Sequence, residues 1–291
     1  MSAENKKDAP LAPGLYLVAT PIGNLEDITL RALRVLRSVD RIACEDTRQT
    51  QKLLNHFNIS TPTVSYHLHN EGPRAEELLT QLKQGARIAV VSDAGTPGIA
   101  DPGHEIANAA IAAGIDVFPI PGANAAISAL IASGLSTEAF TFHGFLPAKE
   151  GQRRTALEEL PRDQATHLFY EAPHRILDTL ADIEAVFGPA QPVVIARELT
   201  KLHEEFLRGP ATDLRAQLSS RASVRGEIVL LFSPALKDAA TPTRSIAAEV
   251  TALMQSESLS EKDALKRVAR ERGIGKSEAY RELQREQNRL R

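Results

Sequence analysis

The chain has 291 residues, which is enough for about two domains and for a buried hydrophobic core without crosslinks. Its single cysteine, Cys44, excludes a disulfide framework, and its polar N-terminus lacks the apolar segment of a signal peptide. No stretch approaches the roughly 18 uncharged apolar residues of a membrane helix, so we expect a cytoplasmic protein without a membrane partner. With 34 Lys+Arg against 37 Asp+Glu, the net charge of −3 excludes the global basicity of a protein that coats nucleic acid.

Charge is distributed unevenly along the chain. Residues 241–291 carry 11 Lys+Arg and 8 Asp+Glu, a net charge of +3, whereas residues 1–240 carry 23 and 29, a net charge of −6. A solvated helical face and a nucleic-acid contact both explain a positive tail of this size.

Residues 1–13 are polar and without periodicity, and we expect a disordered tail. From Gly14 onward, short apolar segments alternate with segments whose apolar residues recur every three or four positions. The expected strands are residues 14–20, 41–46, 63–67, 87–93, 115–120 and 140–145, and the expected helices are residues 28–38, 48–57, 74–84, 105–113 and 123–133. This alternation predicts an α/β domain over residues 14–145, with a mainly parallel sheet covered on both faces.

A second set of elements follows the polar, basic segment 146–155, which we interpret as a hinge or linker. The expected strands are residues 166–172, 192–198, 204–209 and 226–232, and the expected helices are residues 175–187 and 212–220. The short spacing between Glu198 and Glu204 predicts a mixed sheet with one antiparallel pair. Residues 146–234 are therefore a second α/β domain.

Residues 235–291 are expected to form a linker and a C-terminal helical domain, because no strand pattern occurs there. Ser260 and Asp263 have the spacing of a capping box, and Gly273 stands where a helix would end. A second helix after Ser277 would complete a helix-turn-helix-like pair, which fits nucleic-acid binding or simple packing. Each helix would carry a basic row, namely Lys262, Lys266 and Arg270 on the first and Arg281, Arg285 and Arg289 on the second.

Several familiar cofactor motifs are absent. No G-x-G-x-x-G occurs, and residues 275–277 fail the P-loop pattern because Arg270 stands where its first glycine belongs. His67 and His69 have the spacing to share one face of a strand end, but with a single cysteine elsewhere we favour hydrogen-bonded histidines and predict no metal site.

Three glycine-containing loops follow predicted strands, at residues 20–24, 92–103 and 121–125. Ligands of open parallel sheets bind at the carboxyl ends of the strands, where glycine lets them approach the backbone. Ordinary turn chemistry explains any one of these loops, but residues 92–103, with three Gly, two Pro and two Asp, exceed what a turn needs. We therefore expect the three loops to line one cleft.

Charged residues of both signs also end strands, at residues 45–48, 171–175 and 197–201. A structural network of ion pairs is one interpretation of such clusters. The other is a functional site in the cleft between the two domains.

Together, the segments TPIGNLEDIT, EDTR, SDAGTPGIADPG, PGANAA, FYEAPHR and RELTK resemble, in this order, the ribosomal RNA cytidine 2′-O-methyltransferases of the tetrapyrrole methylase superfamily. The resemblance runs from about Gly14 to Phe232 and includes a helix-turn-helix-like C-terminal extension. It implies two αβα domains with S-adenosylmethionine in the cleft between them, bound without the Rossmann glycine motif. It also implies a homodimer, and a cytidine of the decoding region of 16S ribosomal RNA in the small subunit as substrate.

The resemblance also carries the cofactor-binding residues over by position. They are Ile22, Gly23, Ala94, Gly95, Thr96, Ile99, Asn124, Ala125, Glu171, Leu199 and Glu227. The superfamily has Pro-Gly-Asp where this chain has Ile-Gly-Asn at residues 22–24.

Transfer of a methyl group to a ribose oxygen needs two aligned reactants and a base for the hydroxyl proton. The candidate catalytic residues are Glu45, Asp46 and Glu198, of which we expect Asp46 to act as base or orienting group. Basic residues near the cleft are expected to contact RNA phosphates. These are Arg48, Lys149, Arg153, Arg154, Arg175 and Lys201.

Two alternatives remain. One is a small-molecule tetrapyrrole methyltransferase, which would have the same fold. The basic tail and the segment EDTR disfavour this alternative. A non-catalytic module that binds S-adenosylmethionine or RNA would need no charged cluster at the cleft.

Overall fold

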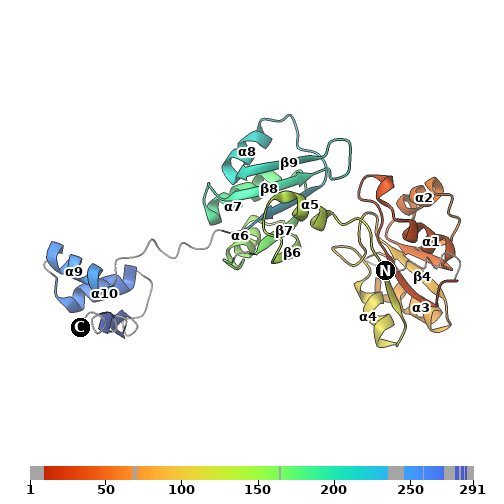
Figure 1. The fold of residues 1–291 in the computed structure, drawn as a ribbon, viewed down its shortest axis with the longest axis horizontal. Helices are drawn as coiled ribbons and strands as arrows, with labels where there is room; N and C mark the ends of the chain where they lie inside the picture. Colours follow the sequence, from red (N-terminus) through yellow and green to blue (C-terminus); the bar gives the residue numbers. More distant parts are fainter. Residues whose placement is uncertain are drawn as a thin grey trace, which may run out of the picture. The chain divides into compact units, whose positions relative to one another are not determined.

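The computed structural model describes residues 10–67, 71–163, 165–234, 246–257, 259–271, 279–281, 283–284 and 286. The chain divides into two compact units, residues 1–234 and 235–291, which are described separately below (Figure 1). Residues 1–9 of the predicted disordered tail and His69 lie outside the described residues.

The first sheet of unit 1 is parallel throughout, as the alternating pattern predicts. Its strands are β1 (Gly14–Val18), β2 (Arg41–Cys44), β3 (Thr63–Ser65), β4 (Arg87–Val91) and β5 (Val117–Ile120), in the order β3-β2-β4-β1-β5. Each strand ends at or before the predicted residue, because the chain leaves the sheet to form the loops at its carboxyl edge.

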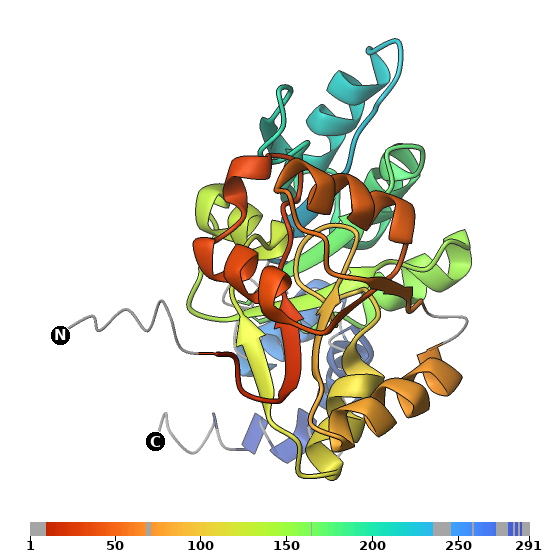
Figure 2. The same cartoon turned by 90° about the vertical axis from the view of Figure 1, so that its right-hand side faces the viewer.

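Helices cover both faces of this sheet. They are α1 (Leu30–Ser38), α2 (Thr47–His56), α3 (Glu71–Lys83) and α4 (His104–Ala112), with a short 3-10 helix at Leu25–Asp27 before α1. Successive residues of a strand point to opposite faces, so Ile42 packs with α1 and α2 whereas Ala43 packs with α3 and α4. Figure 2, which looks toward this sheet, shows the two helix pairs on its two sides.

The second sheet contains β6 (Phe140–Phe145), β7 (Thr166–Glu171), β8 (Pro192–Arg197), β9 (Glu205–Pro210) and β10 (Ile228–Phe232), in the order β6-β7-β10-β8-β9. The prediction of a mixed sheet is confirmed, because β6 pairs parallel with β7. The prediction of one antiparallel pair is wrong, because β7–β10, β10–β8 and β8–β9 are all antiparallel. The extra pairs arise because β10 enters between β7 and β8 and runs opposite to both.

Four helices sandwich the second sheet. Helices α6 (Glu150–Glu158), α7 (Ile176–Phe187) and α8 (Ala211–Ser219) share one core with the sheet, and α5 (Ala125–Ser133) packs on the other face. Strand β6 and helix α5, which precede the predicted domain boundary at residue 145, pack in this second layer. The predicted linker 146–155 is wrong, since α6 begins at Glu150; its buried residues include Arg153, which a hydrophobic pattern cannot reveal.

Unit 2 is helical in its described part. Helix α9 (Ile246–Glu257), which the sequence pattern did not reveal, packs with α10 (Glu261–Glu271), Ala279 and Leu283. The Asp263 N–H donates to Ser260 Oγ at 3.2 Å, so the predicted N-terminal cap is confirmed. Gly273, Ser277, Arg285 and Arg289 lie outside the described residues, so the helix-turn-helix remains a prediction. Across the described chain, no helix is both long and apolar enough to span a membrane.

A histidine pair makes the second sheet sensitive to pH. His167 Nδ1 lies 2.8 Å from Nε2 of His143, and burial lowers the pKa of both rings below the ordinary value of 6.5. Below about pH 6.5 the unfolded chain therefore binds more protons than the folded one, and stability falls as the pH drops.

We predict that the free energy of unfolding declines between pH 7 and pH 5 and that His167→Gln reduces this decline, by up to about 1.4 kcal/mol for each unit of pKa shift removed. Denaturant titrations at several pH values measure the effect, with the exposed His174→Gln as control. An unchanged pH dependence in His167→Gln would contradict the assignment.

Candidate active site

A pocket of about 480 Å³ lies between the two sheets of unit 1. Its walls come from the carboxyl ends of β1, β2, β4, β5, β6, β7 and β8 and from the amino end of β10. The lining residues are Ile22, Glu45, Asp93, Ala94, Gly95, Thr96, Ile99, Ala100, Asp101, Asn124, Ala125, Phe145, Tyr170, Glu171, Ala172, Pro173, Ala196, Leu199, Glu227, Ile228 and Val229. The volume lies in the range of small-molecule sites.

The three glycine-containing loops meet at this pocket, as predicted. Thr20 and Gly95 exchange two backbone hydrogen bonds of 2.9 and 3.1 Å. Thr96 Oγ1 donates to the Ala123 carbonyl at 3.1 Å, and the Asn124 side chain caps α5 by accepting the Ile127 N–H at 3.0 Å. The loops are thus joined to one another by hydrogen bonds, and one of them also caps the helix that follows it.

The long loop 92–103 is fixed at both ends of its final turn. The Gly98 N–H donates to the Pro102 carbonyl at 3.1 Å, and the Gly103 N–H donates to Glu71 Oε1 at 3.1 Å. Glu71 in turn accepts a hydrogen bond of 2.8 Å from the Tyr66 hydroxyl. The loop is therefore an ordered structure that defined hydrogen bonds hold in place.

Ten of the eleven predicted cofactor-binding residues line the pocket; Gly23 does not. Gly23 instead lies beneath residues 200–201, where a Cβ would stand 3.0 Å from Thr200 Oγ1. The next residue, Asn24, donates its N–H to that same hydroxyl at 3.1 Å. Glycine at position 23 thus permits the two halves of unit 1 to meet.

Of the three predicted catalytic residues, only Glu45 lines the pocket, where burial raises its pKa. Asp46 caps α2 by accepting the Arg48 N–H at 2.8 Å, and hydrogen bonds from the Arg48 side chain lower the pKa of its carboxyl. The hydrogen bond from Lys201 likewise lowers the pKa of Glu198, whose Oε1 lies 2.9 Å from Lys201 Nζ. Asp46 and Glu198 are thus held in their ionised forms outside the pocket.

Ten pocket residues were absent from the sequence-based site, and the polar or aromatic ones among them are Asp93, Asp101, Phe145 and Tyr170. Burial, followed by the charges of Glu45 and Asp93, raises the pKa of Asp101 to about 6. The signal for Asp101 was its place in the long loop 92–103, which sequence analysis singled out as a whole without ranking its two aspartates.

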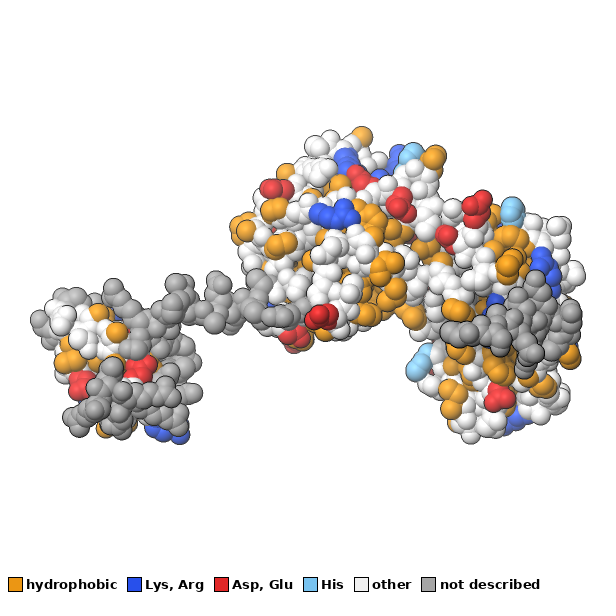
Figure 3. All heavy atoms as spheres, in the orientation of Figure 1, with side chains coloured by type: hydrophobic (Ala, Val, Ile, Leu, Met, Phe, Trp, Pro, Cys, Tyr) orange, Lys and Arg blue, Asp and Glu red, His pale blue; other side chains and the backbone are white. Residues whose placement is uncertain are grey.

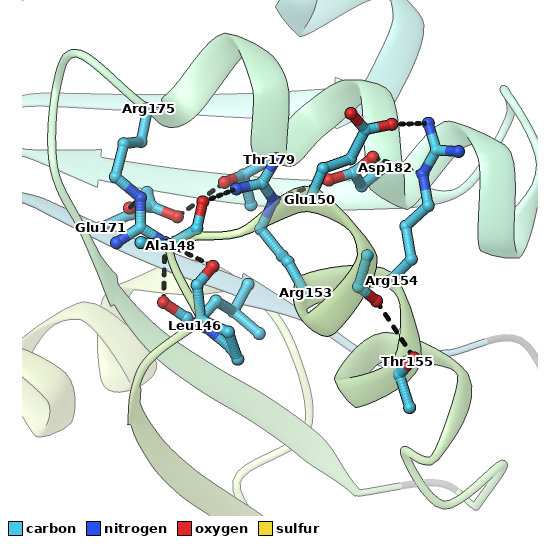
Figure 4. Close-up of polar contacts among 12 residues, drawn as sticks. Leu146, Ala148, Glu150, Arg153, Arg154, Thr155, Glu171, Arg175, Thr179 and Asp182 are labelled. Carbon is cyan, nitrogen blue, oxygen red and sulfur yellow. Dashed lines mark hydrogen bonds and ion pairs between the residues drawn. The ribbon is translucent and has the colours of Figure 1, made fainter.

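The guanidinium groups of Arg153 and Arg175 donate hydrogen bonds to backbone carbonyls rather than facing solvent (Figure 4). Arg153, with 5% of its side chain exposed, binds Asp182 through Nε at 2.6 Å and donates to the Ala148 carbonyl at 3.1 Å. Arg175 pairs with Glu171 at 3.2 Å and donates to the Leu146 carbonyl at 2.7 Å. This burial removes Arg153 from the candidate RNA contacts, because a phosphate cannot reach its guanidinium.

The remaining predicted RNA contacts are more accessible. Arg48 has 88% of its side chain exposed, Lys149 is exposed, and Arg154 is 45% exposed although it binds Asp182 and Glu150. Lys201 is bridged to Glu198 and Glu227. Figure 3 shows basic side chains scattered over the displayed face rather than gathered in one patch.

Within the described residues, no group of three or more His, Cys, Asp or Glu is arranged to hold a metal ion.

The family model for tetrapyrrole (corrin/porphyrin) methylases matches residues 14–215. The chain belongs to this family. It is 48% identical over 91% of its length to ribosomal RNA small subunit methyltransferase I of Halalkalibacterium halodurans, of which 93% is covered. The protein of the same name from Synechocystis is 52% identical over 76% of the chain and 79% of its own length. The chain is thus a methyltransferase of the ribosomal RNA small subunit methyltransferase I group, which confirms the resemblance.

Solved structures confirm the fold class. Uroporphyrin-III-C-methyltransferase from Thermus thermophilus aligns with a TM-score of 0.54 over 76% of this chain and 94% of its own, at 21% identity. At this identity the likeness establishes the two-sheet architecture and not the substrate.

We predict that Asp182→Asn lowers the free energy of unfolding by about 3 kcal/mol, because it leaves the Arg153 charge buried without a counter-ion. Glu150→Gln, which removes only the exposed pair with Arg154, should cost less than about 1 kcal/mol. Denaturant unfolding of the two variants measures the difference. Equal costs would show that the Arg153–Asp182 pair does not act as a buried ion pair.

Proposed function

We propose that this protein transfers a methyl group from S-adenosylmethionine to the ribose 2′-oxygen of a decoding-region cytidine in 16S ribosomal RNA of the small subunit. The observation that carries the proposal is the charge of the pocket. Five carboxylates, Glu45, Asp93, Asp101, Glu171 and Glu227, surround an apolar floor, and the described lining residues include no Lys, Arg or His.

The pocket fits the proposed methyl donor in charge, shape and size. S-adenosylmethionine carries positive charge on its sulfonium and amino groups, which the carboxylates complement. Ala196, Leu199, Ile228 and Val229 offer an apolar surface for a flat adenine ring. Gly95 is in the left-handed region at φ +88°, which lets a ligand lie close to the loop backbone.

Bound there, S-adenosylmethionine supplies a methyl carbon that is open to attack by an oxygen nucleophile. The chain's contribution is then to align the ribose with that carbon, which is the larger part of catalysis in such a displacement. Residues 94–96 and 124–125 would hold the donor by backbone and side-chain contacts. A carboxylate at the pocket would accept the hydroxyl proton.

Two lines of support favour ribosomal RNA over a tetrapyrrole as the acceptor. The relatives that match at 48–52% identity are named ribosomal RNA small subunit methyltransferase I, whereas the tetrapyrrole enzyme aligns at 21%. Exposed Arg48, Lys149 and Arg154 supply positive charge outside the acidic pocket, where phosphates would lie. Cytoplasmic location and a homodimer complete the proposal.

The decisive test is incubation of the protein and S-adenosylmethionine with unmodified small subunits, naked 16S RNA and a porphyrinogen in parallel, followed by mass spectrometry. We expect a 2′-O-methylated cytidine in a ribosomal sample, and comparison of subunit with naked RNA shows which form is the substrate. Methylation of the porphyrinogen alone would contradict the proposal.

A second prediction concerns residues 94–96, which would hold the methyl donor. Gly95→Ala introduces a Cβ 3.3 Å from Ile22 Cγ2 at a residue with φ +88°, so we expect donor affinity to fall about tenfold, which corresponds to about 1.4 kcal/mol. Gly85→Ala is the matched control, because Gly85 has the same φ of +88° and nothing within 4 Å of an added Cβ. Calorimetric titration measures both affinities; an equal affinity of the two variants would place the donor elsewhere.

A further inference from the structure

Three of the five pocket carboxylates contact a donor or a basic side chain of the chain. Asp93 Oδ1 accepts the Asp46 N–H at 3.1 Å. Glu171, with none of its side chain exposed, pairs with Arg175. Glu227 Oε2 lies 3.0 Å from Lys201 Nζ. Each of these three carboxylates is thus already engaged by a donor of the chain.

Glu45 and Asp101 are the other two pocket carboxylates, and they lie in different backbone environments. Glu45 directly follows β2 and precedes the capping residue of α2. Asp101 lies inside the turn closed by the hydrogen bond from the Gly98 N–H to the Pro102 carbonyl.

The backbone before Asp101 is strained. Ala100 has φ +61°, in the left-handed region that a residue with a Cβ rarely adopts. Such a conformation persists only where the surrounding structure holds it, and here the anchor from Gly103 to Glu71 does so. The turn therefore holds the backbone on both sides of Asp101, whose side chain lines the pocket.

We propose that Asp101 is the general base of the methyl transfer, an inference that rests on the proposed function. The 2′-oxygen bonds to the methyl carbon while the bond from that carbon to sulfur breaks. The electron pair of the broken bond stays on sulfur, which becomes neutral. The proton of the 2′-hydroxyl moves to the Asp101 carboxylate and leaves to water after the reaction.

The charges around Asp101 suit this task. Glu45 and Asp93 face it from the first sheet and Tyr170 from β7, while the Ser92 side chain stabilises its ionised form by a hydrogen bond. Burial and the two neighbouring carboxylates set its pKa near 6, so it is ionised at pH 7.5 yet holds a proton better than an exposed aspartate.

The remaining charged groups near this cluster are the two paired pocket carboxylates and one histidine. Glu171 and Glu227 line the pocket, and their charges are met by Arg175 and Lys201. His67 partly offsets the rise in the pKa of Glu45 that burial and Asp93 cause.

The test measures single-turnover methylation of the small subunit or its RNA from pH 5 to 8.5. For the wild-type enzyme, we expect the logarithm of the rate to fall with slope one below an apparent pKa near 6. With saturating donor, Asp101→Asn should lose at least about a hundredfold in rate at pH 7.5 and lack this acid limb. The acid limb should persist in Glu45→Gln and in the control Asp213→Asn, an exposed aspartate in the first turn of α8.

A measurement without substrate tests the environment of Asp101 independently. Because its pKa is raised in the folded chain, the folded state binds more protons than the unfolded state between about pH 4 and 6, and stability falls as the pH rises through that range. Asp101→Asn should therefore melt at a higher temperature than wild type at pH 7.5, and the difference should shrink toward pH 4.5.

Three results would overturn the inference: a wild-type rate independent of pH between 5 and 8, an undiminished rate in Asp101→Asn, or loss of the acid limb in Glu45→Gln instead. A wild-type enzyme that methylates no ribosomal RNA would contradict the proposed function and with it the role of Asp101. In the first three cases the proposed function stands.

Discussion

The pocket depends on the backbone bridge between Thr20 and Gly95. This bridge ties the loop after β1 to the loop after β4, two strands that are neighbours in the first sheet. It requires the left-handed backbone of Gly95, and the adjacent Thr96 extends the same contact to the loop after β5 through Ala123. Backbone donors and acceptors that a parallel sheet leaves unpaired at its carboxyl edge are thereby satisfied among the loops. The three loops that line the pocket are consequently tied to one another by the chain's own hydrogen bonds.

Acidic side chains line the pocket, and basic side chains near it are paired, a distribution that affects both substrate binding and proton transfer. Carboxylates face the pocket, whereas Arg153, Arg175 and Lys201 are bound to carboxylates or to backbone carbonyls. An acidic pocket attracts a cationic donor and repels phosphate, so an RNA substrate would present a ribose hydroxyl there while its backbone stays outside. The same field raises the pKa of Asp101, so donor binding and proton acceptance share one electrostatic cause.

Much of the fold and the meeting of three loops at one pocket followed from the sequence, because alternating elements and long glycine-containing loops are local patterns. The failures have physical reasons. Residues 146–155 were interpreted as a linker because Arg153 counts as polar in any hydrophobic pattern, while Asp182, its buried counter-ion, lies on α7 and is distant in sequence. The antiparallel insertion of β10 between β7 and β8 is likewise a long-range pairing that no local pattern encodes.

Glu45 and Asp46 show how far the sequence alone could identify the carboxylate that lines the pocket. Both follow β2, and the sequence alone favoured the second, but an α-helix must satisfy its first N–H groups and Asp46 is the residue placed to cap α2. Capping draws its carboxylate to Arg48 and away from the pocket, so the preceding residue enters instead. Where an acidic pair joins a strand to a helix, the requirement for a cap therefore decides which carboxylate is left for chemistry, and here it leaves Glu45 beside Asp101.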